Sequence, residues 1–364
     1  MTKELSTAAM TPRRRIEQLV SNPTCETNVA SALLKVSVQN ITKDYGVNPN
    51  GGMSSFAFAR GRSFEKYILR KRDDGTTALG KQLVHKNLIK SEQPEHLEVV
   101  DLRVKDFEES KVKSIDFLRD LPNRENKQIQ VLASGFRFRT SKIQPAGDVE
   151  IDLLLCSYDD LEKQWKIRIG EVKVYPDRAG FTDKNKLATA RAQAGLYRNF
   201  LVQFLKSAGV ESEVSVLDRC FFVFTKATGA GVSVWANEDI SEQDVRAENA
   251  LALMNQRVAS DEFRDLAQDD VEFDRKLEFL RSHTKKSYNE NCWNFCDLAE
   301  YCLKQLVRED DALVLGAEAK QELGDISIER MLSLLNGVGN PSELEADVLE
   351  RFADADIKLG GGSK

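Results

Sequence analysis

The stretch 147-GDVEIDLLLCSYDDLEKQWKIRIGEVKVY-175 decides the fold class of this chain. It contains two segments, 147–159 and 164–175, in which apolar residues recur with the period of two that is typical of strands. A short polar connection separates them, so the sequence predicts a hairpin. Strands joined by so short a connection are most simply antiparallel neighbours.

Further strands and helices are predicted on both sides of this hairpin. The order helix, three strands, helix, strand indicates an α/β core. Residues 73–127 are polar and mixed, and they predict short helices without recognisable chemistry. The predicted elements are a helix at 54–72, a strand at 129–142, the two hairpin strands, a helix at 185–207, a strand at 219–226, and helices at 242–258 and 270–282.

Composition sets the limits on the class of protein. The chain has 364 residues, of which 41% are hydrophobic, and this is enough to build a sizeable core. No apolar run approaches the roughly 20 residues of a membrane span, and the first residues lack the apolar stretch of a signal peptide. We therefore expect a cytoplasmic protein with no membrane contact.

Charge is distributed unevenly along the chain. The whole chain carries a net charge of −6, which by itself argues against a nucleic-acid partner. Residues 163–206, however, contain ten Lys or Arg against three acidic residues, a local net charge of +7. This basic segment includes the second hairpin strand and the helix that follows it.

Glu171 and Lys173 are two apart on a predicted strand, so their side chains point to the same face. An antiparallel neighbour would bring Asp152 beside them. Two carboxylates with a lysine suit phosphodiester cleavage, because hard oxygen ligands hold Mg²⁺ or Mn²⁺ and the ammonium can position a water or neutralise charge. The alternative is a solvated surface pair, since five other acid-x-Lys pairs occur in polar or helical surroundings.

The predicted helix after this strand adds polar groups near the same place. Gln193 and Tyr197 are four residues apart and therefore share one helical face. Arg191 and Arg198 lie close to them in sequence and would suit phosphate contacts.

Taken in order, these motifs resemble the RecB-like branch of the PD-(D/E)XK nuclease superfamily. The resemblance covers roughly residues 25–302 and implies a restriction-endonuclease-like core, a central mixed sheet flanked by helices, with a helical C-terminal extension. It implies an N-terminal segment at 1–54, a nuclease domain at 55–303 and a helical tail at 304–364 that suits partner docking. The matching motifs are Gly61-x-x-x-Glu65, Gly147 to Asp152, Glu171-Val172-Lys173 and Gln193-x-x-x-Tyr197.

The family's site residues can be carried over one by one. By resemblance, Asp152 and Glu171 bind Mg²⁺ or Mn²⁺, and Glu65 from an upstream helix is the further metal ligand. Lys173 serves catalysis, and Gln193 with Tyr197 contacts DNA beside the site. The sequence offers Asp148 as well, and Asp152 is preferred because the strand continues with apolar residues directly after it.

Four of the six cysteines fit the same resemblance. Several RecB-like nucleases hold an iron–sulfur cluster with one cysteine before the nuclease motifs and three after them, which ties the ends of the fold together. Here Cys25 precedes the motifs and Cys292, Cys296 and Cys302 follow, with a Cys-x3-Cys spacing where those relatives have Cys-x2-Cys. Four thiolates suit a [4Fe–4S] cluster and also zinc. The third alternative is a set of buried core cysteines.

The sequence thus predicts a metal-dependent DNA nuclease. By resemblance only, it would work with a motor ATPase or helicase in DNA repair or antiviral defence. The alternative is a catalytically silent nuclease fold that serves as a scaffold or DNA-binding subunit. The presence of both carboxylates and the lysine argues against that alternative, because a silent relative would be expected to have lost one of them.

Overall fold

The computed structural model describes residues 15, 18, 19, 22–47, 55–142, 146–178, 180–182, 184–227, 231–258, 265–268, 270–288, 292, 296–310, 312 and 317–354. The chain divides into two compact units. We call Met10–Val20 with Gly51–Gln268 the sheet unit, and Met1–Ala9, Ser21–Asn50 and Asp269–Lys364 the cysteine unit. The domain boundaries at 54/55 and 303/304 stay predictions.

The sheet unit is built on one mixed sheet of seven strands among the described residues. Its order is β1-β2-β3-β4-β6-β7, and β5 pairs with β4 outside this path. The pairs β1/β2, β4/β5 and β4/β6 are parallel, and the other three are antiparallel. The strands are β1 (Leu97–Asp101), β2 (Gln130–Thr140), β3 (Gly147–Asp159), β4 (Gln164–Asp177), β5 (Val214–Val216), β6 (Arg219–Lys226) and β7 (Val232–Asp239).

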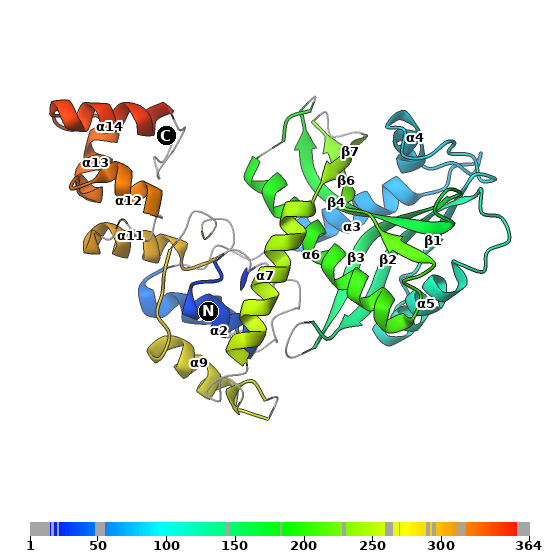
Figure 1. Ribbon diagram of the computed structural model, residues 1–364, viewed down its shortest axis with the longest axis horizontal. Coiled ribbons are helices and arrows are strands. Elements are labelled where there is room, and N and C mark those ends of the chain that lie inside the picture. The colour runs from blue at the N-terminus through cyan, green and yellow to red at the C-terminus, as the bar shows by residue number, and fades with distance from the viewer. Residues whose placement is uncertain are drawn as a thin grey trace. The chain divides into compact units, whose positions relative to one another are not determined.

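Helices flank this sheet, and the predicted α/β class with a mixed sheet between helices is confirmed (Figure 1). In the sheet unit the helices are α3 (Ser55–Leu69), α4 (Ala78–His85), α5 (Phe107–Asp120), α6 (Lys184–Ala208) and α7 (Ser241–Val258). The cysteine unit contains α2 (Glu26–Leu34), the 3₁₀ helix η1 (Val38–Tyr45), α9 (Phe273–Ser282), α11 (Ala299–Glu309), α12 (Ala317–Leu323), α13 (Ile328–Leu335) and α14 (Glu343–Asp354). Within the described ranges, no helix has both the length and the apolar character needed to cross a membrane.

Strand β4 lies at the centre of the sheet, because it pairs with β3 on one side and with β5 and β6 on the other. Val172 packs into a cluster of buried apolar side chains from α3, α4 and five strands. Its neighbours in β4, Glu171 and Lys173, therefore point to the opposite face, where Lys173 contacts α6. The alternation in the sequence thus places two charges on one face and the core on the other.

Three of the strands were not predicted, namely β1, the three-residue β5 and β7. Strand β1 has five residues and lies at the sheet edge, in the segment 73–127 for which we expected only short helices. Strand β7 is the other edge, and its second half is polar and exposed. Edge strands bury one side poorly, so the apolar alternation that reveals a strand is weak in both.

Gly195 permits the close approach of α6 to α7, and this predicts a stability effect. A β-carbon at this position would lie 2.7 Å from the backbone carbon of Gln243 and 2.8 Å from the amide nitrogen of Asp244. Gly195→Ala is therefore expected to lower the free energy of unfolding by about 1–3 kcal/mol through overpacking.

Urea unfolding followed by circular dichroism measures this effect, and Gly61→Ala is the matched control. Gly61 also lies within a helix, but a β-carbon there meets no atom of the described residues within 4 Å. The control is expected to be stabilising by about 0.5–1 kcal/mol because alanine loses less entropy in a helix. Equal effects of both substitutions would contradict the packing argument.

Candidate active site and cysteine cluster

The hairpin β3/β4 brings the predicted carboxylates to one place. The pairing of β3 with β4 ends at Leu153 and Gly170, and Asp152 and Glu171 come next along their strands. The side chain of Asp152 contacts β4: its Oδ2 accepts a hydrogen bond from the amide nitrogen of Val172 at 3.0 Å.

A continuous series of contacts links Glu171 to α6. Glu171 is fully buried, Lys173 is 7% exposed, and the ammonium of Lys173 is ion-paired with Oε1 of Glu171. Lys173 Nζ also donates to Gln193 Oε1 at 2.9 Å, and Gln193 Nε2 donates to Tyr197 Oη at 2.8 Å. Four of the residues that the sequence singled out on β4 and α6 are therefore joined in the order 171, 173, 193, 197.

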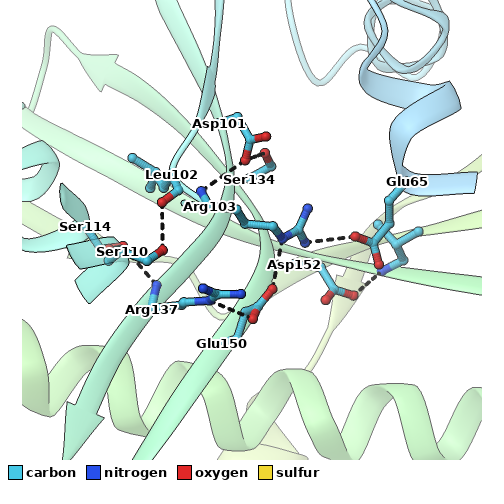
Figure 2. A network of polar contacts seen from close by, with 11 residues as sticks. Glu65, Asp101, Leu102, Arg103, Ser110, Ser114, Ser134, Arg137, Glu150 and Asp152 are labelled. Atoms are coloured by element: carbon cyan, nitrogen blue, oxygen red, sulfur yellow. Dashed lines mark hydrogen bonds and ion pairs between the residues drawn. The ribbon is translucent and has the colours of Figure 1, made fainter. Parts of the chain in front are cut away.

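Glu65 reaches this region from α3, as expected from its position in the Gly61-x-x-x-Glu65 motif (Figure 2). Burial raises the pKa of Glu65 to about 7, and the Asp152 carboxylate adds to this shift. Arg103 and Lys173 act in the opposite direction. Glu65 thus lies within electrostatic reach of both Asp152 and Lys173, and burial is the main reason that its pKa is raised.

The structure adds one residue that the sequence did not indicate. Arg103 follows β1 and lies between two carboxylates: Nη2 is 2.9 Å from Oε2 of Glu65, and Nε is 2.9 Å from Oε1 of Glu150 (Figure 2). Arg137 binds the second oxygen of Glu150 at 2.8 Å. The apolar run of β1 followed by the helix-capping Asp106 was the feature that could have revealed this strand–loop–helix unit.

The structure also separates the two candidate aspartates. Asp148 is bound by Lys111 at 3.1 Å and lies 3.6 Å from Arg139. Asp152 has no ion pair within the described part of the chain, and it influences Glu65 electrostatically. This difference supports the choice of Asp152.

The two predicted DNA-contacting arginines are engaged within the sheet unit. Arg191 Nη2 is 2.5 Å from Glu238 Oε2, and Arg198 is paired with Asp244 and donates to the carbonyl of Leu217 at 3.1 Å. Their role in phosphate binding stays a prediction, and it would compete with these pairs.

In the cysteine unit, the four predicted cysteines come together although Cys25 and Cys292 are far apart in sequence. All four are buried and free of disulfides. Burial raises the pKa of the Cys302 thiol to about 12, with further contributions from Cys25 and Cys292. The pKa of Cys296 is raised for the same reason, with contributions from all three other thiols.

Short contacts organise the segments that carry these thiols. Asn22 Nδ2 donates to Cys292 Sγ at 3.3 Å, and Cys296 Sγ lies 3.6 Å from Asn28 Oδ1. The amide nitrogen of Cys296 donates to the carbonyl of Cys292 at 2.8 Å. Cys156 and Cys220 lie instead in β3 and β6, within the sheet core.

The carboxylates of the sheet unit and the thiols of the cysteine unit differ in the metals that they suit. No three His, Cys, Asp or Glu side chains of the described residues already stand in a metal-holding arrangement. The donor chemistry nevertheless suits the predicted ions. Carboxylate oxygens at Glu65, Asp152 and Glu171 are the ligands that Mg²⁺ and Mn²⁺ prefer, and four clustered thiols suit iron–sulfur or zinc. A bound cation would also stabilise the charged forms that burial now disfavours.

Comparisons with known proteins do not assign the chain to a family. No family model matches it. It is 24% identical over 204 residues to cytoplasmic dynein 2 heavy chain 1 of Mus musculus and of Rattus norvegicus; the match covers 52% of this chain and 4% of each dynein chain. The crystal structure of the Legionella pneumophila effector protein RavZ covers 72% of this chain, and this chain covers 71% of it, with 11% identity and a TM-score of 0.17.

Proposed function

We propose that this chain is a cytoplasmic, metal-dependent DNA nuclease of the RecB-like type. The observation that carries the proposal is the buried contact series from Glu171 through Lys173 and Gln193 to Tyr197 beside Asp152. The sequence motifs alone do not require these side chains to touch. Their meeting on one face of β4 is what a phosphodiester-cleaving site needs.

Each residue has a distinct role in this proposal. Asp152, Glu171 and Glu65 would hold Mg²⁺ or Mn²⁺, which when bound supplies Lewis acidity and lowers the pKa of a water. Lys173 keeps an ammonium beside Glu171, where it can orient a water or neutralise the negative charge that develops on phosphate. Gln193 joins Lys173 to Tyr197, and both α6 residues are 3% exposed. Their contact with DNA stays a prediction from the resemblance.

The order of elements supports a PD-(D/E)XK core for the sheet unit. With α4, β1, α5 and β5 set aside as additions, helix α3 precedes the antiparallel strands β2, β3 and β4, and then come α6 and β6, which runs parallel to β4. This is the order of helix, three strands, helix and strand that the sequence predicted. The candidate site lies on the central strand of that arrangement.

We also propose a metal site in the cysteine unit and a protein partner for the chain. Cys25, Cys292, Cys296 and Cys302 would hold a [4Fe–4S] cluster, with zinc as the alternative. A motor ATPase or helicase is the expected partner, by resemblance. The tail helices α13 and α14 suit docking, because Val338 and Leu344 are 62% and 67% exposed there.

Cleavage of labelled oligonucleotides tests the nuclease function directly. The full chain is incubated with single-stranded and double-stranded DNA, and with RNA, in Mg²⁺ or Mn²⁺, and chelation of the metal is the control. We expect DNA cleavage that requires the metal. Intact substrates under all these conditions would favour the silent scaffold or DNA-binding subunit instead.

The protonation of Glu65 provides a second prediction. Because its pKa is raised to about 7, the carboxyl group is expected to be neutral below that pH and charged above it in the metal-free protein. Carbon-13 NMR of glutamate carboxyl groups measures the titration, and Glu65→Gln identifies the resonance. Added Mg²⁺ is expected to lower the midpoint, because a bound cation stabilises the carboxylate. A midpoint near 4.5, the ordinary value, would contradict the burial of this group.

A further inference from the structure

The two carboxylates Glu65 and Asp152 are held in the same manner. Each has one oxygen bound by a protein donor: Oε2 of Glu65 by Arg103 and Oδ2 of Asp152 by the amide of Val172. For the second oxygen of each, Oε1 and Oδ1, the described residues supply no hydrogen bond. A carboxylate held at one oxygen keeps its other oxygen available in a defined direction.

Hydrogen bonds of the loop after β1 hold the backbone at Arg103 in place (Figure 2). Its amide nitrogen donates to Asp101 Oδ1 at 3.1 Å, and the same oxygen accepts from Ser134 Oγ at 3.2 Å. The neighbouring amide of Leu102 donates to the carbonyl of Ser134 at 3.0 Å. These hydrogen bonds attach the loop after β1 to β2 at Ser134.

Gly135 leaves the space that the side chain of Arg103 occupies. It has a φ of +66°, and a β-carbon there would lie 2.6 Å from Nε and 2.8 Å from Cδ of Arg103. Any larger residue would displace the arginine and strain the backbone. The side chain of Arg103 is 25% exposed and packs over Gly135.

Neutralising the charge of Glu150 does not by itself require Arg103. Glu150, the other partner of Arg103, already has a cation of its own, because Arg137 binds its second oxygen at 2.8 Å. Glu65 has no other ion-pair partner within the described ranges. Among the described residues, Arg103 alone forms an ion pair with Glu65, and this contact orients the Glu65 carboxylate.

We propose that Arg103 is a positioning residue of the candidate active site: it holds Oε2 of Glu65 so that Oε1, together with Oδ1 of Asp152, can bind one divalent cation. This inference rests on the metal site of the proposed function. It adds an outer partner for Glu65 that neither the motifs nor the resemblance supplied.

Manganese binding without nucleic acid tests the proposal. Free Mn²⁺ is measured by electron paramagnetic resonance during titration of the full chain, so the result does not depend on cleavage. Arg103→Met is expected to weaken Mn²⁺ binding by about 10–100-fold, as loss of an outer partner does at other metal sites. Arg103→Lys is expected to recover part of this loss, because an ammonium can bond one carboxylate oxygen but cannot bridge two carboxylates.

Arg137→Met is the matched control. It removes a cation from the other oxygen of Glu150 without touching Glu65, and it is expected to leave Mn²⁺ affinity unchanged. Circular dichroism confirms that each variant is folded. Unchanged or tighter Mn²⁺ binding by folded Arg103→Met and Arg103→Lys would overturn the proposal, because Arg103 would then be only a counter-ion that repels the metal. Wild-type protein that binds Mn²⁺ but cleaves nothing would overturn the nuclease function alone.

Discussion

Replacing Lys173 with methionine is expected to lower metal-dependent DNA cleavage by about 10²–10⁴-fold, the range found when a proton-transfer or charge-stabilising group is removed. The reason is the position of its ammonium, which contacts both Glu171 and Gln193 in a site that is almost closed to solvent. Initial cleavage rates at saturating metal measure the effect. Retained cleavage would show that Lys173 is not a catalytic residue.

The same substitution is expected to destabilise the protein. Glu171 is fully buried, so loss of the Lys173 ammonium removes an ion pair from a buried carboxylate, at a cost of about 3–5 kcal/mol. The double variant Glu171→Gln/Lys173→Met removes both charges and is expected to recover most of that stability while remaining inactive. Thermal unfolding of the two variants thus separates a folding defect from a catalytic one.

Lys166→Met is the matched control for this pair of experiments. Lys166 lies on the same strand, and its ion-pair partner Glu162, in the hairpin connection, is 63% exposed. An ion pair with one partner in solvent contributes about 0–1 kcal/mol. The control is expected to keep both cleavage and stability, and a comparable loss in it would show that any lysine of β4 matters equally.

The second large effect is expected in the cysteine unit. Protein purified without oxygen should be brown and contain iron and sulfide, and Cys292→Ser or Cys296→Ser should lose the colour and the metal. Metal binding contributes folding free energy, on the order of 10 kcal/mol for structural zinc sites, so these variants should also become sensitive to protease. Absorption spectra, iron, sulfide and zinc analysis, and limited proteolysis measure these outcomes.

The chain supplies its own controls for this experiment. Cys156 and Cys220 are as buried as the four clustered cysteines, but they lie in β3 and β6. Cys156→Ala and Cys220→Ala should retain the colour and the metal. Colourless wild-type protein with bound zinc would identify the alternative ion, and wild-type protein with no metal would contradict the cluster.

Local sequence patterns predicted much of the sheet unit correctly. The hairpin β3/β4 follows from alternation on either side of a polar turn, and α6 follows from its apolar spacing. These elements are long and partly buried, so each carries its own pattern. The short edge strands β1 and β7 are stabilised mainly by pairing with a neighbour, and their own residues reveal them poorly.

The amino-acid sequence by itself determined that Glu171 and Lys173 share a face of one strand and that Gln193 and Tyr197 share a face of one helix. Those relations depend only on the periods of strand and helix. Tertiary packing is what brings Lys173 to Gln193, places Asp152 near Glu65, and pairs Arg103 with Glu65. These contacts join segments from different elements, and their geometry depends on sheet register, helix packing and the space left by Gly135, which no local pattern records.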